Sequence, residues 1–296
     1  MTSNPTTPAA WANFLSKAWG RDRFPIDVKL IAQDIGSRQP DPIATIRGGD
    51  IGALEGMLLK REKGWYLLYS DQVQSSGRIT FTIAHELGHY LLHRKEREIF
   101  ECGDKDIATG DRGERDIETE ADLFASTLLM PLDDFRKQIE GQPVSFDLLG
   151  RCAGRYGVSL TAAALRWTEI ADKRAILVAS RDDHMLWAKS NRAAFKSGAY
   201  FATRKHTIEL PQTALAHSHN CSAASDAQAA RAQTWFPREP SSMTLSEMTR
   251  VAGQYDYTLT LLLMPEAEWQ RPEHEDGEPE EDTFDRFIRN GQYPVQ

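Results

Sequence analysis

The stretch that decides the fold of this chain is residues 81–93, which read FTIAHELGHYLLH. It contains an H-E-x-x-H pentapeptide, in which His85 and His89 are four residues apart and Glu86 follows the first histidine. Residues four apart lie on one face of a helix, so both imidazoles can bind one metal ion. The apolar flanks predict a buried helix over about residues 77–94. Two histidines and a carboxylate would be costly to bury there without a function.

Zinc is the metal that this pattern favours, because it accepts two nitrogen ligands, one oxygen ligand and a water molecule. Glu86 would stand beside the metal and take a proton from the bound water. A third ligand is expected from residues 114–131, ERDIETEADLFASTLLMP, which predict a second amphipathic helix. We choose Glu120 because it lies among the apolar positions of that helix, with Glu118 and Asp122 as alternatives.

The two motifs together resemble the ImmA/IrrE family of metallopeptidases. HELGHYLLH is followed about thirty residues later by ETEADLFASTLLMP, and the resemblance covers roughly residues 1–170. It implies a small zincin-type domain. By position, it implies zinc ligands at His85, His89 and Glu120 and a general base at Glu86.

Two further positions bear on this resemblance. His93 matches the histidine that ends the first motif of the family, and it is a candidate catalytic residue that would stabilise the oxyanion or orient a ligand. A supporting role behind the metal ligands is the alternative. Asp122 stands where the family commonly has asparagine, which is a minor departure.

The resemblance also implies a function, because several family members cleave a helix-turn-helix repressor and so switch on an operon. We therefore expect a zinc-dependent endopeptidase whose substrate is a partner helix-turn-helix repressor, in a stress, mobile-element or antiphage-defence operon. The first alternative is a non-proteolytic anti-repressor or DNA-binding regulator with a structural zinc site, which would have no need for Glu86. The second alternative is a housekeeping peptidase of broad specificity.

A cysteine lies between the two predicted helices. Residues 95–113 are polar and rich in glycine, so they are expected to form an exposed, mobile loop that carries Cys102. A thiolate binds zinc well and would displace the catalytic water, which makes Cys102 a candidate inhibitory fourth ligand. The alternative is a free thiol without a role in the site.

Composition limits the remaining classes of protein. The chain has 296 residues, 41% hydrophobic content and a formal net charge of −8, which argue for a globular protein of about two domains without a general affinity for nucleic acid. Three cysteines are too few for a disulfide framework. We see no signal peptide and no run of apolar residues long enough to cross a membrane, so we expect a cytoplasmic protein.

The predicted fold class is α+β. Residues 1–172 are expected to form the zincin-like domain, with helices packed on a small, mostly antiparallel sheet. A strand within residues 52–70 would lie nearest the motif and bind an extended substrate. Residues 145–170 have the pattern of a helix-turn-helix, although alanine-rich packing positions favour a plain helical hairpin. The strands expected in this domain are 43–46, 52–59 and 65–69.

A smaller α+β domain should follow at residues 173–265, and the family resemblance implies that it is of the GAF-like type that some members carry. A helix is predicted over residues 244–255. The acidic residues 266–296 should form a disordered tail with a short terminal helix. The strands expected in this domain are 175–179, 185–188, 207–210, 213–216 and 257–264.

The second domain also contains a basic segment. Residues 181–238 hold eight basic and four acidic residues with interleaved aromatic rings, a composition that suits single-stranded DNA or a small-molecule effector. The alternative is that the rings form a core and the charges a solvated face. The candidate effector-binding residues are Arg192, Lys196, Arg204, Lys205 and Trp235.

Overall fold

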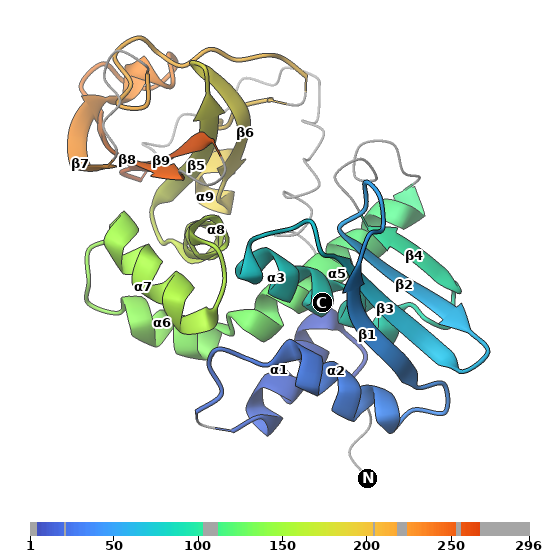
Figure 1. Ribbon diagram of the computed structural model, residues 1–296. Helices are drawn as coiled ribbons and strands as arrows, with labels where there is room; N and C mark the ends of the chain where they lie inside the picture. Colours follow the sequence, from blue (N-terminus) through green and yellow to red (C-terminus); the bar gives the residue numbers. More distant parts are fainter. Residues whose placement is uncertain are drawn as a thin grey trace, which may run out of the picture. The chain divides into compact units, whose positions relative to one another are not determined.

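The computed structural model describes residues 5–20, 22–102, 112–203, 205–217, 224–252 and 256–266. Within these ranges the chain forms two compact units, and both combine helices with a β-sheet, as the sequence predicts (Figure 1). The first unit contains the residues up to Gly141 together with Arg151–Ala162. The second unit contains Gln142–Gly150 and the residues from Ala163 onward. The predicted acidic tail lies outside the described residues from position 267.

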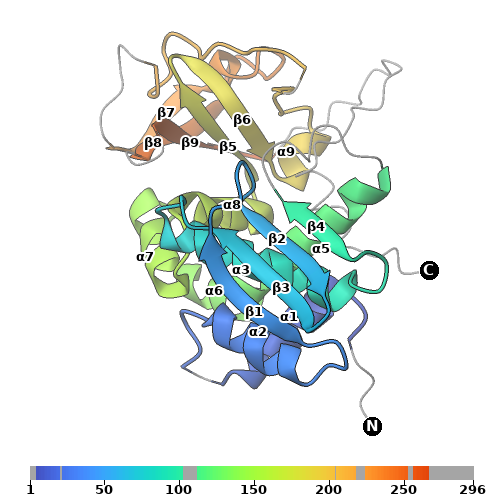
Figure 2. The same ribbon diagram turned by 45° about the vertical axis from the view of Figure 1, so that its right-hand side comes forward.

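A four-stranded sheet forms one layer of the first unit, with the strand order β1-β3-β2-β4 (Figure 2). Strands β2 and β3 form an antiparallel hairpin, β4 pairs antiparallel with β2, and β1 runs parallel to β3. The sheet is therefore mostly antiparallel, as predicted. The strands are β1 (Ile43–Gly49), β2 (Gly56–Arg61), β3 (Gly64–Ser70) and β4 (Ile99–Cys102).

Strand β4 corrects the expectation of a wholly irregular loop over residues 95–113. Its side chains alternate between the two faces of the sheet, with Phe100 and Cys102 buried and Ile99 exposed. Gly56 of β2 pairs with Cys102, so β2 has a partner strand on both sides. The prediction that a strand within 52–70 offers a free edge beside the motif is therefore wrong. The outer strand at this edge is β4.

Helices form the other layer of the first unit, and their ends follow the sequence. Helix α3 (Ser76–Leu92) carries the H-E-x-x-H motif, and the Ser75 side chain accepts a hydrogen bond from the backbone N–H of Arg78. Helix α2 begins at Val28, because the Asp27 side chain accepts a hydrogen bond from the backbone N–H of Leu30 and caps the first turn. The helices of this layer are α1 (Pro8–Ala18), α2 (Val28–Ser37), α3, α5 (Arg112–Leu129) and α6 (Leu132–Ile139).

Gly88 sets the close approach of α3 to α5. A Cβ atom at this position would lie 3.1 Å from the Phe124 ring and 3.2 Å from the Cα atom of Ala121. Ala121 and Phe124 are both fully buried. The glycine between the two histidines of the motif therefore lets α5 pack directly against α3.

The predicted helix pair of residues 145–170 is present as α7 (Phe146–Tyr156) and α8 (Leu160–Ile170). Gly157 makes the turn between them with a positive φ of 64°, and Ser159 caps α8. In α8, Ala163 and Ala164 are buried, and Arg166 is buried and paired with Glu169 at 2.8 Å. The cation that a recognition helix would offer to DNA is therefore held inside the protein.

The second unit contains a five-stranded antiparallel sheet with the order β6-β5-β9-β8-β7. Its apolar side chains pack with Trp235 and Phe236 into one core. Arg174, the first residue of β5, is paired in the sheet with Met264, the last residue of β9, and its guanidinium donates to the carbonyl of Pro265 at 2.7 Å. The elements are β5 (Arg174–Arg181), β6 (His184–Ser190), α9 (Arg192–Lys196), β7 (Ala224–Arg231), η1 (Ala232–Thr234), β8 (Thr244–Ala252) and β9 (Tyr257–Met264).

Three predictions for this unit are wrong. The helix predicted over 244–255 is strand β8, because Leu245 and Met248, three residues apart, imitate a helical spacing but are buried between β7 and β9. Residues 207–210 contribute only an isolated bridge to β6, and residues 213–216 form turns. Strand β7 was not predicted. No helix in the described part of the chain is long and apolar enough to cross a membrane.

Candidate metal centre

The two motif histidines lie on one buried face of α3. His85 and His89 are one helical turn apart, and their Nε2 atoms approach to 3.0 Å. His89 is fully buried, and its ring stacks on Phe100 of β4 with a centroid distance of 4.6 Å. The helix and the adjacent strand thus direct two imidazole nitrogens to one point, as the spacing predicts.

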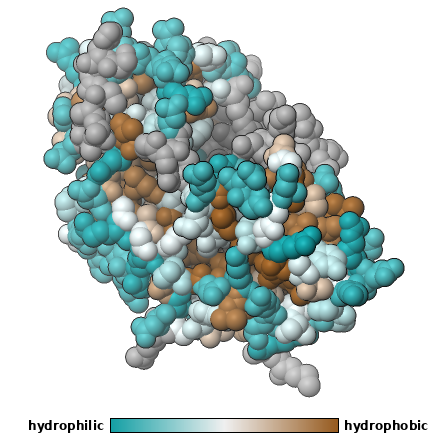
Figure 3. Space-filling model, in the orientation of Figure 1, coloured by the Kyte–Doolittle hydropathy of each residue, from teal (hydrophilic) through white to brown (hydrophobic). Residues whose placement is uncertain are grey.

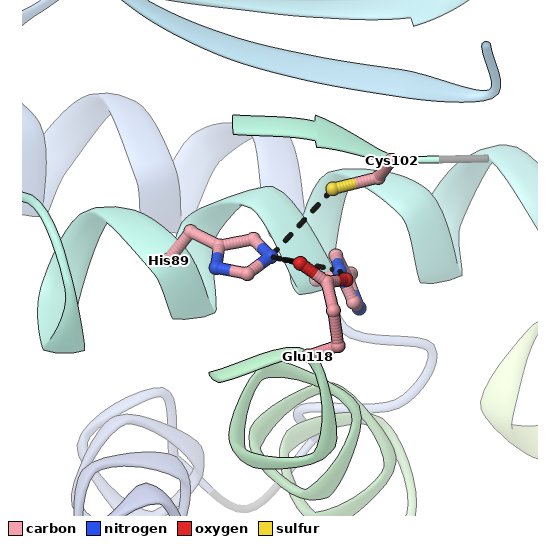
Figure 4. Close-up of side chains that lie close together, drawn as sticks. His89, Cys102 and Glu118 are labelled. Atoms are coloured by element: carbon pink, nitrogen blue, oxygen red, sulfur yellow. Dashed lines mark hydrogen bonds and ion pairs between the residues drawn. The ribbon is translucent and has the colours of Figure 1, made fainter. Parts of the chain in front are cut away.

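Glu118 on α5 brings a carboxylate to the same point. Its Oε2 lies 3.1 Å from His85 Nε2, and its Oε1 lies 3.3 Å from His89 Nε2. The Cys102 thiol approaches from β4, with Sγ 3.6 Å from His89 Nε2 (Figure 4). One donor atom from each of these four side chains lies within 4.8 Å of all the others.

The structure places Glu118, not the predicted Glu120, in this cluster. Residues two apart on a helix point in directions about 200° apart, so the two carboxylates of α5 cannot face the same point. Glu120 instead contacts Nε2 of His93 at 3.0 Å, and its side chain is 46% exposed. A sequence signal for Glu118 existed, because Glu118 and Asp122 repeat the four-residue spacing of His85 and His89.

Hydrogen bonds on the far sides of the imidazoles fix their orientation. Asp122 contacts Nδ1 of His85 at 2.8 Å, and Nδ1 of His93 contacts Nδ1 of His89 at 3.1 Å. If Nε2–H of His93 donates to Glu120, Nδ1 of His93 can accept a hydrogen bond from Nδ1–H of His89. This assignment leaves the Nε2 lone pairs of His85 and His89 facing each other, an arrangement that a bound cation stabilises.

Glu86 is the one polar side chain of the motif without a partner. It is fully buried, and neither carboxylate oxygen has a hydrogen-bond partner among the described residues. Gly56 of β2 lies so close that a Cβ atom there would collide with Oε1 of Glu86. Burial raises the pKa of Glu86 to about 7, against the opposing effect of His85. A carboxyl group with this pKa can accept and return a proton near neutral pH.

The electrostatics of His89 and Glu118 suit a metal ion. Burial lowers the pKa of His89 to about 4, which keeps its nitrogens available as ligands. The pKa of Glu118 lies well below its ordinary value, because its contacts with the two histidines outweigh the effect of burial. In a tetrahedral zinc site, ligand atoms lie about 3.3–3.6 Å apart, given bonds of about 2.0–2.3 Å. The donor separations of 3.0–3.6 Å are close to this range.

The comparisons with known proteins agree with this geometry. The family model of the IrrE N-terminal-like domain, Peptidase M78, matches residues 51–168, which include α3, β4 and α5. This segment belongs to that metallopeptidase family. No curated protein matches the chain in sequence.

A solved structure shares the fold on both sides of the IrrE N-terminal-like domain. It is described as a Mycobacterium tuberculosis transcriptional regulator and is 15% identical to this chain, with a TM-score of 0.55. The match covers 87% of this chain and 76% of the regulator. At this level of identity the likeness concerns the fold alone.

Outside the IrrE N-terminal-like domain, the structure places one of the predicted effector-binding residues in the core and three on the surface. Trp235 is 4% exposed, and its Nε1 donates to the buried carboxylate of Glu247 at 3.1 Å, so its ring is part of the core and not a stacking surface. Arg192, Lys196 and Lys205 are exposed. Arg204 lies outside the described residues.

Proposed function

We propose that the IrrE N-terminal-like domain is a zinc-dependent endopeptidase. The observation that carries this proposal is the meeting of His85, His89 and Glu118 at one point beside Glu86, a carboxylate that is buried without a partner. Two histidines and one carboxylate are a ligand set of catalytic zinc sites. A fully buried, unpaired carboxylate is costly, and proton transfer from a water molecule gives it a purpose.

Each residue has a distinct task in this mechanism. When bound, zinc supplies a Lewis acid for the scissile carbonyl and lowers the pKa of a bound water molecule. Glu86 takes the proton of the attacking water and delivers it to the leaving amine, which its pKa of about 7 allows. Asp122 and His93 hold the two ligand imidazoles in orientation. We therefore assign His93 to positioning rather than to the oxyanion.

The substrate we propose is a partner helix-turn-helix repressor, cleaved to derepress a stress, mobile-element or antiphage-defence operon. The support is the membership of residues 51–168 in the IrrE N-terminal-like family together with the resemblance of the two motifs. A narrow specificity also suits a site that the protein itself covers, since Glu86 has no exposed surface. A general degradative peptidase would require an accessible cleft.

We propose the second unit, of GAF-like type, as the receiver of the signal, with single-stranded DNA or a small molecule as the effector. The exposed cations Arg192 and Lys196 lie on α9, and Lys205 follows shortly after. Tyr200, 39% exposed and paired with Phe195 at 5.2 Å, offers the exposed ring that Trp235 does not. Cations beside an exposed ring are what stacked bases need.

The test is a cleavage assay with purified repressor candidates encoded beside this protein. Zinc-loaded wild type should cut one of them, with or without added single-stranded DNA. Glu86→Gln should bind the same amount of zinc and cut at least about 100-fold more slowly, given the typical contribution of a general base. Normal cleavage by Glu86→Gln would refute the mechanism.

The alternative is a non-proteolytic anti-repressor with a structural metal site, and one observation favours it. Cys102 gives the cluster four protein donors, the number typical of structural zinc sites. Loss of operator binding by a repressor that stays intact, with equal effects of wild type and Glu86→Gln, would establish this alternative.

A further inference from the structure

We propose that Cys102 is the fourth ligand of the metal in the resting protein and keeps the peptidase latent until β4 releases it. The inference rests on the proposed function and adds its regulation. The Sγ atom lies 3.6 Å from His89 Nε2, within the cluster that includes His85 and Glu118. Figure 4 shows the thiol pointing at the same nitrogen of His89 that Glu118 approaches.

The position of the thiol is fixed by the sheet and not by a mobile loop. Cys102 pairs with Gly56, and its carbonyl accepts a hydrogen bond from the backbone N–H of Glu55 at 2.9 Å. Its side chain is buried on the face of β4 that also carries Phe100, which stacks on His89. Strand β4 thus presents the sulfur to the metal ligands in one defined orientation.

The state of Glu86 is an independent sign that this conformation is closed. A general base needs a water molecule within hydrogen-bond reach, yet the Glu86 side chain has no exposed surface. Gly56 covers the carboxylate from the β2 side. The sulfur stands where the fourth ligand of a catalytic zinc site, a water molecule, would be. Both observations indicate a site that can bind a metal but that is closed to the catalytic water.

Release of the thiol requires only a local change. Cys102 is the last residue of β4, a strand of four residues that pairs only with β2 in the described part of the chain. At the other end of the strand Ile99 is 54% exposed, so the apolar contact that must yield besides that of Cys102 is the one of Phe100. Binding of the metal by Cys102 transfers the thiol proton to solvent, and release of the thiolate takes one proton back. No oxidant or reductant is needed.

The first test uses cobalt in place of zinc, because a thiolate bound to Co²⁺ gives a sulfur-to-metal charge-transfer band in the near ultraviolet. Full-length wild type loaded with Co²⁺ should show this band, and Cys102→Ala should lose it. Cys152→Ala is the matched control, because Cys152 is a buried free cysteine on α7, outside the cluster. It should keep the band. A cobalt-loaded wild type without the band would overturn the proposal.

The second test separates latency from the proposed function. Zinc-loaded Cys102→Ala should cleave the repressor at least tenfold faster than wild type, and Cys152→Ala should match wild type. A wild-type band together with equal cleavage by wild type and Cys102→Ala would overturn latency while the peptidase stands. A band with no cleavage by any variant on any repressor would reject both latency and the peptidase and establish a structural site.

A third measurement does not depend on the stability of a variant. Zinc should protect Cys102 of wild type from alkylation by iodoacetamide under native conditions. Removal of the metal should leave the alkylation rate of Cys152 unchanged. Equal alkylation of Cys102 with and without zinc would contradict its role as a ligand.

Discussion

The carboxylate of Asp122 lies 2.8 Å from Nδ1 of His85, one helical turn after Glu118 on α5. The same face of one helix therefore supplies a carboxylate that approaches Nε2 of both histidines and another that holds the His85 ring. A histidine that donates Nδ1–H to a carboxylate keeps the lone pair of Nε2 directed at the metal. His89 has an equivalent support in His93, which Glu120 holds in turn.

Loss of Asp122 should weaken the metal site without removing a ligand. Asp122→Ala should lower zinc affinity by about 10- to 100-fold, the usual effect of losing such a support. Asp122→Asn should stay near wild type, because the amide oxygen can still accept a hydrogen bond from Nδ1–H of His85. Competition titration with a chromogenic chelator measures both affinities. Equal affinity of the alanine variant and wild type would show that the contact has no role in metal binding.

The two glutamates of α5 should behave differently. Glu118→Gln should lose zinc affinity by more than about 100-fold, because a neutral amide replaces a charged ligand. Glu120→Gln should change it by less than about tenfold, since an amide oxygen still accepts a hydrogen bond from His93. The metal content of dialysed protein is the measurement. The opposite order would restore the sequence-based choice of Glu120.

Gly88→Ala should destabilise the domain even though alanine is the better helix former. The gain in helix propensity is up to about 1 kcal/mol. The new methyl group would press on the Phe124 ring and on the main chain at Ala121, and overpacking of this kind costs about 1–3 kcal/mol. Urea denaturation followed by circular dichroism gives the free energy of unfolding.

The matched control for this substitution is Gly150→Ala on α7. A Cβ atom at Gly150 meets nothing within 4 Å, so only the helix propensity should change. We expect Gly150→Ala to be neutral or more stable than wild type. A stabilising Gly88→Ala would mean that α5 moves away from α3 at no cost, and its zinc affinity would then report the effect on the site.

Asp134 should make stability depend on acid pH. Arg155 and Tyr156 donate hydrogen bonds to its carboxylate at 2.7–3.0 Å, and these lower its pKa although burial acts in the opposite direction. A pKa lowered by folding contributes stability above the unfolded value of about 3.9, and this contribution is lost as pH falls. Asp134→Asn should cost about 2 kcal/mol at pH 7 and much less at pH 3.

Asp133→Asn is the control for that pH series. Its carboxylate is 51% exposed and contacts only the Arg23 guanidinium among the ion pairs that the described residues form. An exposed pair contributes at most about 1 kcal/mol. A loss of stability in Asp134→Asn that is the same at pH 7 and pH 3 would contradict the assigned cause.

The sequence predicted the parts of the fold that depend on local spacing. The helix with His85 and His89, the helix with Glu118 and the strand 257–264 all follow from patterns within one element. The metal pair could be predicted because one helix carries both histidines. The third ligand could not be chosen with the same security, because it depends on which face of α5 packs against α3.

Features that depend on pairing between distant segments were not predictable in this way. Strand β4 is four residues long and gains its structure from β2, so its own sequence gave no sufficient signal. Strand β7 reads ASDAQAAR, with small and polar residues of low strand propensity, and it forms because β8 lies beside it. Trp235 was a candidate effector-binding residue by sequence, but its indole N–H donates to Glu247 in the core, a residue twelve positions away.

The pairing of Arg174 with Met264 has a consequence for how such a chain can change. The first and last strands of the five-stranded sheet, β5 and β9, are neighbours. The Arg174 guanidinium donates to the carbonyl of Pro265, so the residue that follows β9 is held beside the first residue of β5. A segment whose two ends meet can be exchanged for another of different length or chemistry at a single junction. The five-stranded sheet is thus built as an interchangeable module, through which one IrrE N-terminal-like domain could be coupled to different signals by recombination.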